Sequence, residues 1–434
     1  MNRKELAQLV ITSLRKGIPP QRGFELYSVG HEKLIKGVKK RHMSQIAHQG
    51  LILFINGSYG SGKTHLFRLL REIALGQNCL VSSVELKAKE TPFSKFEKVF
   101  SSIVRNIQTP AMYNNGIGHE AEPFSRVLDE VLSMHVTGTR ENVSQISADQ
   151  YNEAHQALMQ DRHIALDFKK IVAKYWETYV PGRPFSHETV RDETRGEALQ
   201  WFSGEGTAQT FRTKFDVNKM ITGETAKVML QSLTGFIGFA GYRGLMILFD
   251  EAAQAYEHLQ EKERKQAYNN LFHLINEIEL LPGLFLVYAT TPSFYSEKKY
   301  GILLLESLAS RIGKLPDRAP RPMDAVWNLD QAKIGLNDYK QAAVKIRDVY
   351  KEAFQDDEDD LDAELPSQEE IGAFVEQLFE QHGQTSNIRF WRVMTSALIK
   401  FCEDFVDGEA SSPEETYRDV MEDLNEMEDL TEEN

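Results

Sequence analysis

The chain of 434 residues has little cysteine, with only Cys79 and Cys402, far apart in the sequence. Two distant cysteines exclude the disulfide framework of a small secreted domain and a cysteine-rich zinc cluster. No apolar run approaches the roughly 18 residues that indicate a membrane-spanning helix. The first residues also lack the apolar segment and cleavage site of a secretory signal. We therefore expect a cytoplasmic protein without a membrane partner.

The chain also lacks an excess of positive charge. Its net charge of −14 is concentrated at one end, because residues 401–434 hold 14 acidic residues and one basic residue. The other 400 residues therefore carry a net charge of about −1. This balance gives no positive evidence for a nucleic-acid partner and does not exclude one. We expect residues 408–434 to form an acidic tail that is disordered or only transiently helical.

Apolar runs of strand length alternate with amphipathic helical patterns. This alternation predicts an α/β fold whose mainly parallel sheet is covered on both faces. The runs that predict strands are residues 51–56, 78–86, 245–249 and 284–289.

The region between the second and third of these strands is too long for a simple crossover, so we expect a helical insertion. Its clearest helical pattern covers residues 153–179. After residue 322 the patterns are helical only, at residues 336–354, 368–381 and 386–405.

The segment GSYGSGKT, residues 57–64, fits the phosphate-loop pattern Gly-x-x-x-x-Gly-Lys-Thr and lies between a strand and a helix, as that motif requires. Its glycines allow backbone N–H groups to converge on phosphates, and the helix adds its positive N-terminus. Lys63 should reach the β- and γ-phosphates of ATP, and the Thr64 hydroxyl should ligate Mg²⁺. The predicted nucleotide-binding residues of this segment are Gly57, Ser58, Tyr59, Gly60, Ser61, Gly62, Lys63, Thr64 and His65.

Polar residues follow two of the predicted strands, at the edge where open α/β sheets bind ligands. Asp250 is expected to orient Mg²⁺, and Glu251 to polarise the water that attacks the γ-phosphate. Alternatively, both acids cap a following helix. Thr290 and Thr291 end another strand, where a hydroxyl could contact the γ-phosphate or cap the helix before Pro292.

Two arginines are further candidates. Arg311 could be an arginine finger that acts on the ATP of a neighbouring subunit, which would imply a homo-oligomer. Arg389 could contact the γ-phosphate of the ATP that its own chain binds, and Arg392 is the alternative candidate for this role. Surface salt bridges are the alternative for all three.

Two other groups of residues admit a functional reading. The basic residues of segment 36–41 suit either nucleic acid or, more simply, a solvated helix face. Phe390 and Trp391 suit the core better than a platform for base stacking.

These motifs, in this order, resemble AAA+ ATPases of the Orc/Cdc6-like type. A closer resemblance is to the BrxD-like ATP-binding proteins of bacteriophage-exclusion (BREX) defence systems. It rests on the passages LRKGIPPQRGFELYSVGHEKL, INGSYGSGKTHLFRLL, ALQWFSGEG, GYRGLMILFDEA and YATTPSFY.

The resemblance implies that Arg22 and residues 27–31 lie near the adenine. The chain departs from the AAA+ pattern in three places. Its sensor strand ends in threonine rather than the usual asparagine. Residues 383–392 fit the sensor-two pattern only loosely. No winged-helix segment follows the C-terminal helices, so sequence-specific DNA binding is not implied.

The sequence thus predicts a P-loop NTPase of AAA+-like type with an all-α C-terminal lid. The predicted parts are an N-terminal helical segment (1–48), an ATPase core (49–320) with its insertion at about 108–240, a helical lid (321–407) and the acidic tail (408–434).

The leading functional hypothesis is an ATP-hydrolysing component of an antiphage BREX-like system. Its nucleotide state would control association with other defence proteins, among them a helicase, or with DNA. The alternatives are a nucleotide-gated scaffold with slow hydrolysis and a DNA-dependent, helicase-loader-like ATPase.

Overall fold

A computed structural model describes residues 2–59, 61–114, 123–182, 184–250, 256–332, 334–355, 361–382, 387–408 and 412–432. Its centre is a six-stranded sheet in the order β3-β2-β4-β5-β1-β6. All pairings are parallel except the one between β2 and β3. The predicted α/β class is confirmed. The strands are β1 (Leu51–Asn56), β2 (Leu80–Glu85), β3 (Ile107–Gln108), β4 (Leu245–Asp250), β5 (Leu284–Thr290) and β6 (Val326–Asn328).

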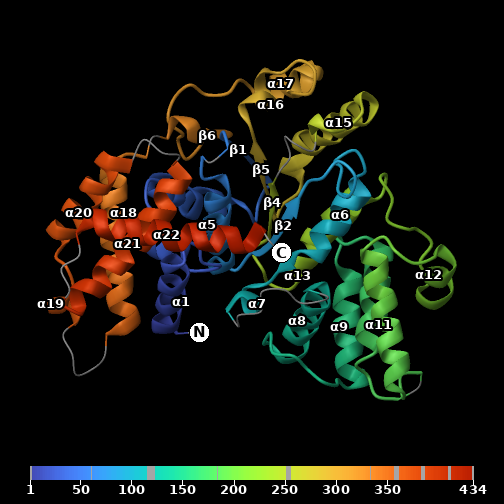
Figure 1. The fold of residues 1–434 in the computed structure, drawn as a ribbon. Helices are drawn as coiled ribbons and strands as arrows, with labels where there is room; N and C mark the ends of the chain where they lie inside the picture. Colours follow the sequence, from blue (N-terminus) through green and yellow to red (C-terminus); the bar gives the residue numbers. More distant parts are fainter. Residues whose placement is uncertain are drawn as a thin grey trace.

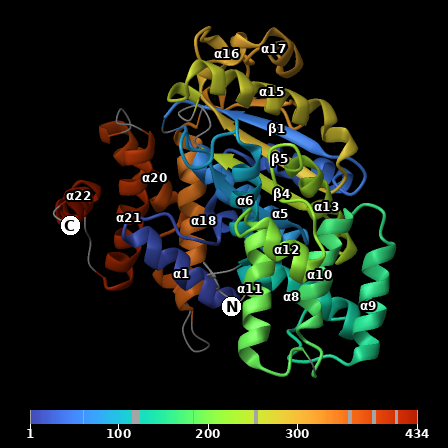
Figure 2. The ribbon, with the colours of Figure 1, turned by 90° about the vertical axis from the view of Figure 1, so that its right-hand side faces the viewer.

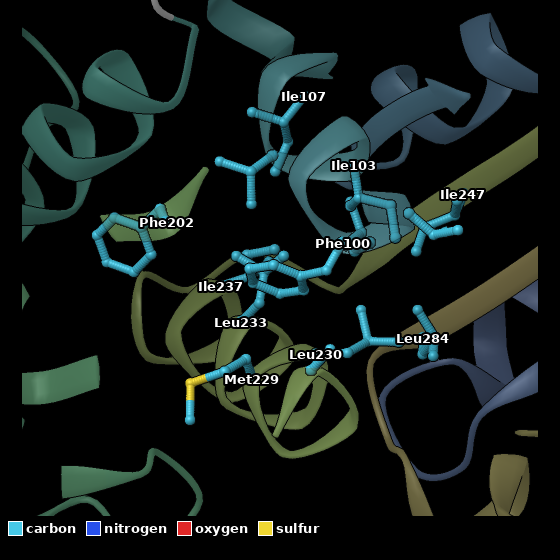
Figure 3. Packing of buried hydrophobic residues seen from close by; sticks show 14 of the residues in the cluster. Phe100, Ile103, Ile107, Phe202, Met229, Leu230, Leu233, Ile237, Ile247 and Leu284 are labelled. Atoms are coloured by element: carbon cyan, nitrogen blue, oxygen red, sulfur yellow. The ribbon is translucent and has the colours of Figure 1, made fainter. Parts of the chain in front are cut away.

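The strands β1, β4 and β5 are apolar on both faces, so the sheet separates two hydrophobic cores. On one face, α6 (Phe96–Arg105) and α13 (Ala226–Phe239) pack on the sheet. Figure 3 shows Leu230 and Leu233 of α13 close to Phe100 of α6. On the other face lies α5 (Lys63–Gly76), the helix that follows the glycine-rich segment.

Between β3 and β4 the chain forms α7 (Pro110–Asn114), α8 (Pro123–Thr137), α9 (Ala148–Gln160), α10 (Leu166–Glu177), α11 (Glu188–Phe202), α12 (Ala208–Phe215) and then α13 (Figure 1). The single helix predicted at residues 153–179 is wrong, because α9 ends before α10 begins. Asp161 is extended at the end of α9, with ψ 130°. Lys169 of α10 donates to the carbonyl oxygens of Met159 (3.0 Å) and Asp161, which satisfies the end of the first helix.

Further described helical elements lie between β4 and β6, and Figure 1 shows α15, α16 and α17 at its top. They are α15 (Glu261–Glu277), η2 (Ile278–Leu280), α16 (Pro292–Ser296), η3 (Ile302–Leu304) and α17 (Glu306–Ile312).

The two ends of the chain form one helical layer. The N-terminal helix α1 (Arg3–Arg15) packs against α18 (Leu336–Phe354) and α21 (Asn387–Val406), as Figures 1 and 2 show. Polar contacts fix it there: Gln8 Nε2 donates to the carbonyl of Ala353 (3.0 Å), and Ser396 Oγ donates to that of Leu14 (3.0 Å). α1 therefore packs against helices from the other end of the chain. The rest of the layer is α19 (Leu361–Glu364), α20 (Gln368–His382) and α22 (Pro413–Glu432).

Four short helical elements lead from α1 to β1, and one follows β6. They are α2 (Phe24–Tyr27), α3 (Glu32–Gly37), the π-helix η1 (Val38–His42), α4 (Met43–Gln45) and η4 (Leu329–Gln331). Among the described residues, no helix combines the length and the apolar character needed to cross a membrane.

The acidic tail is more ordered than the sequence predicts. Residues 413–432 form α22, which packs on α20 and α21. Thr416 and Val420 are buried, and the Tyr417 ring stacks on that of His382 with centroids 3.6 Å apart. The expectation of disorder is wrong for this segment because its few apolar residues recur at helical spacing, which a charge count does not detect.

The substitution Val420→Asp is expected to release α22, because a carboxylate would enter a site that is 5% exposed. The loss of a buried valine contact costs about 1.5–3 kcal/mol. Limited proteolysis should then cut faster within α22, while Glu422→Ala, at an exposed position of the same helix, should behave like the wild type. Equal cleavage rates for both variants would show that α22 does not depend on this contact.

Candidate functional site

The glycine-rich segment forms the corner between β1 and α5. Gly62 precedes the first residue of α5 and has φ +88°, a conformation that favours glycine. At Gly57 a Cβ would lie 2.0 Å from Ser61 Oγ, so a larger residue does not fit. Gly60 lies outside the described residues. The two fixed glycines of the motif are therefore both required by the local backbone.

The polar groups of this corner face inward. Lys63 Nζ donates to the carbonyl oxygens of Gly57 (2.6 Å) and Ser58 (2.9 Å), so its ammonium group lies over the loop. Ser61 Oγ is buried and has no hydrogen-bond partner among the described residues. The Thr64 side chain is exposed at the start of α5. An unpaired buried hydroxyl in the same loop as an ammonium group is suited to donate a hydrogen bond to a phosphate oxygen.

Ser58 is held from outside the loop. Its backbone N–H donates to both carboxylate oxygens of Asp330 (2.9 and 3.1 Å), and its hydroxyl donates to one of them (2.9 Å). Asp330 belongs to η4, directly after the edge strand β6. The amide of Ser58 is therefore used to anchor the loop.

The sheet order places the acidic strand end near the loop. β5 lies between β1 and β4, so the ends of these three strands meet at one edge of the sheet. Asp250, at the end of β4, lines the same cavity as Ser61, Gly62 and Lys63. Glu251, directly after it, lies outside the described residues.

The cavity has a volume of about 370 Å³ and two chemically different groups of lining residues. One group is polar and contains the phosphate-loop residues, Asp250, Arg68 and Arg392. The other group is mainly aromatic and apolar and comes from both ends of the chain. Its lining residues include Ile18, Phe24, Tyr27, Val29, His31, Tyr339 and Trp391. A polar end joined to an aromatic bowl matches the triphosphate and the base of a nucleotide.

Within the bowl, Tyr27 and Trp391 lie with their rings 28° from parallel and their centroids 6.4 Å apart. His65 Nε2 lies 2.8 Å from Ser28 Oγ, and burial lowers the pKa of His65 to about 4. Burial also lowers the pKa of His31, whose Nδ1 has no hydrogen-bond partner among the described residues. Both imidazoles are therefore neutral at physiological pH, and His31 keeps a ring nitrogen available to a polar edge of a ligand.

The two threonines are used within the fold. Thr290 is fully buried, with its hydroxyl 3.3 Å from the carbonyl oxygen of Ile55 and 3.2 Å from the Tyr295 hydroxyl. Thr291 precedes the first residue of α16, and its hydroxyl lies 2.7 Å from that of Ser293. Neither is among the described residues that line the cavity.

The arginines are placed differently from one another. Arg392 lines the cavity and donates from Nε to the carbonyl of Gly17 (3.0 Å). Arg389 lies near the start of α21, as Arg392 does, and its side chain lies outside the described residues. Arg22 is buried with its guanidinium 4.4 Å from the centre of the Tyr113 ring, and Arg311 is exposed on α17. Neither Arg22 nor Arg311 is among the described residues that line the cavity.

Sequence reasoning missed part of the aromatic bowl. Phe390 is buried in the core as expected, whereas its neighbour Trp391 is only partly buried and lines the cavity. Tyr339 and Ile18 were not singled out at all. The signal in the sequence is the position of Trp391 near two arginines on a helix with an otherwise apolar face, but only the packing of α21 in the fold brings it to Tyr27.

The site combines a glycine-rich corner that carries a lysine and a threonine, an acidic strand end and an aromatic bowl. These features together define a nucleotide-binding α/β protein. The chain belongs to the family described as BREX system ATP-binding protein BrxC/D, whose model matches residues 2–421. This match confirms the resemblance seen in the sequence, and the chain is an ATP-binding component of BREX defence systems. No curated protein and no solved structure matches it significantly.

Proposed function

We propose that the protein is a magnesium-dependent ATPase of AAA+-like type whose nucleotide state controls its association with other components of the BREX system. The observation that supports this most is the cavity itself, because it joins the phosphate loop and Asp250 to an aromatic bowl built from both ends of the chain. A cytoplasmic location remains an expectation from the sequence.

In this proposal the phosphate loop binds the triphosphate. Backbone N–H groups of Ser61 and Gly62 and the Lys63 ammonium group contact phosphate oxygens, and the Ser61 hydroxyl gains the partner that it lacks. Thr64 and Asp250 would hold Mg²⁺, which supplies charge neutralisation for the β- and γ-phosphates. The exposed hydroxyl of Thr64 and the half-buried carboxylate of Asp250, both oxygen donors, suit that ion.

For hydrolysis, Glu251 accepts a hydrogen bond from the attacking water and takes its proton as the new bond to the γ-phosphorus forms. The bond between this phosphorus and the bridging oxygen of ADP breaks. Lys63 stabilises the negative charge that builds up on the phosphate oxygens. Products are ADP and inorganic phosphate.

The aromatic bowl gives the first test of this proposal. Trp391→Ala is expected to weaken ATP binding by about 1–3 kcal/mol, the range found when an aromatic platform for a base is removed. Trp391→Phe should retain most of the affinity. Phe405→Ala, on the same helix but 38% exposed, should leave it unchanged. Titration of a fluorescent ATP analogue measures all three, and equal affinities would place the base elsewhere.

Arg311 gives a second test. Since it is exposed on α17 and the described lining of the cavity does not include it, we propose that it acts on ATP bound by a neighbouring copy. Turnover per chain should then rise with protein concentration in the wild type. In Arg311→Ala it should stay low at every concentration. Wild-type turnover that is independent of concentration would contradict action between subunits.

A further inference from the structure

A second cavity, of about 270 Å³, lies beside α5 at the edge of the sheet formed by β2 and β3. Arg68 and Arg71 of α5 line it, together with Arg105 at the end of α6. The rest of the wall combines apolar residues (Val81, Ile107, Met112 and Pro123) with neutral polar ones, and the described lining contains no carboxylate. These neutral residues are Gln21, Ser83, Asn106 and Gln108.

The arginines are positioned rather than merely close in sequence. Arg68 and Arg71 are three residues apart and therefore share one face of α5. Arg71 Nε donates to Gln108 Oε1 (2.9 Å), and this bond fixes the plane of the guanidinium group. Burial lowers the pKa of Arg71, Tyr113 and the carboxylate of Glu72 raise it, and the positive charges of Arg22 and Arg68 lower it. The cavity thus concentrates like charges that repel one another.

Counter-charges within the described residues balance this cluster only in part. The charge of Glu72 acts on Arg71, although no ion pair of the described residues includes Arg68 or Arg71. Arg105 pairs with Glu205, whose side chain is 57% exposed, so solvent screens that pair. The half-buried Glu72 is also shared, because it accepts hydrogen bonds from the Tyr113 hydroxyl and the backbone N–H of Gly23. An anion in the cavity would supply the missing negative charge.

We propose that this cavity is a second anion site, which binds the phosphate group of a small ligand apart from the ATP site. Guanidinium groups match phosphate oxygens in paired hydrogen bonds, and the amide and hydroxyl groups of the wall add neutral donors. The volume lies just below the usual range for small-molecule sites. It therefore suits pyrophosphate or the phosphate end of a mononucleotide.

The proposal is tested by calorimetric titration of pyrophosphate into the full-length protein, with ADP present to occupy the first cavity. Arg105→Gln and Arg71→Gln are each expected to weaken pyrophosphate binding by about 10- to 100-fold. Arg212→Gln removes the same charge at an exposed position on α12 and should have no effect. Arg68 is left intact because it lines both cavities.

Two readouts keep the interpretation unambiguous. The affinity for fluorescent ADP, measured in parallel, should be the same in all variants, and a failure of ADP to bind the wild type would count against the ATP site alone. Arg105 has a half-exposed side chain, so its variant should fold normally even if Arg71→Gln does not.

A single-stranded oligodeoxynucleotide of about 12 nucleotides serves as a second probe, to distinguish a phosphodiester from a free phosphate group. Binding of either probe that both arginine variants weaken supports the site and identifies its source of phosphate. The proposal is overturned if neither probe binds, or if Arg105→Gln binds both as tightly as the wild type does.

Discussion

Lys63→Ala is expected to lower ATP turnover by about 100- to 1,000-fold, the scale found when one preorganised charge-stabilising group is removed from an active site. The reason is that the Lys63 ammonium group lies at the loop, within hydrogen-bond distance of two of its carbonyl oxygens. It is therefore already placed where phosphate oxygens would arrive. Phosphate release from ATP measures the effect.

Lys36→Ala is the matched control for this substitution, because Lys36 is exposed and carries the same charge. Its turnover should equal that of the wild type. Circular dichroism should show the same helix content for both variants, since Lys63 bonds within one short loop. Wild-type turnover in Lys63→Ala would defeat the assignment of the phosphate loop.

Glu251→Gln is expected to reduce turnover by about 100- to 10,000-fold while ATP remains bound, because the amide accepts no proton from water. This substitution separates the two leading functions. A hydrolysing enzyme should lose turnover and retain ATP, whereas a nucleotide-gated scaffold with slow hydrolysis should change little in either quantity. Single-turnover hydrolysis and ATP affinity are measured on the same protein.

Glu257→Gln is the control for this second substitution, since Glu257 is exposed and lies six residues further along the chain. It should match the wild type in both measurements. If Glu251→Gln instead abolished ATP binding, the residue would act in binding the nucleotide rather than in activating water.

The sequence predicted those features that depend on local patterns. The apolar runs predicted β1, β4 and β5, because a strand buried on both faces is apolar almost throughout. The spacing of glycine, lysine and threonine predicted the loop, since each of these residues is required by the backbone or the chemistry at its position. Helix 336–354 was predicted with the bounds of α18.

Features that depend on contacts between distant segments were not predictable in this way. The edge strands β3 and β6 have two and three residues, too few for a periodic signal. The sequence predicted Trp391 to lie in the core. Its place in the cavity wall beside Tyr27 depends on a contact between residues that are far apart in the sequence. The apolar stripe of α22 was hidden by its acidic residues, and its order depends on α20 and α21.

The packing of α1 on α18 and α21 has a practical consequence for the first residues of the chain. They pack against helices from the C-terminal end of the chain. Buried residues such as Ala7, Val10 and Ile11 cover the apolar side of α18 and α21. Deleting them would uncover that side and promote aggregation. A fluorophore attached at the amino terminus would travel with the carboxyl-terminal helices and so report their displacement as nucleotide binds and leaves.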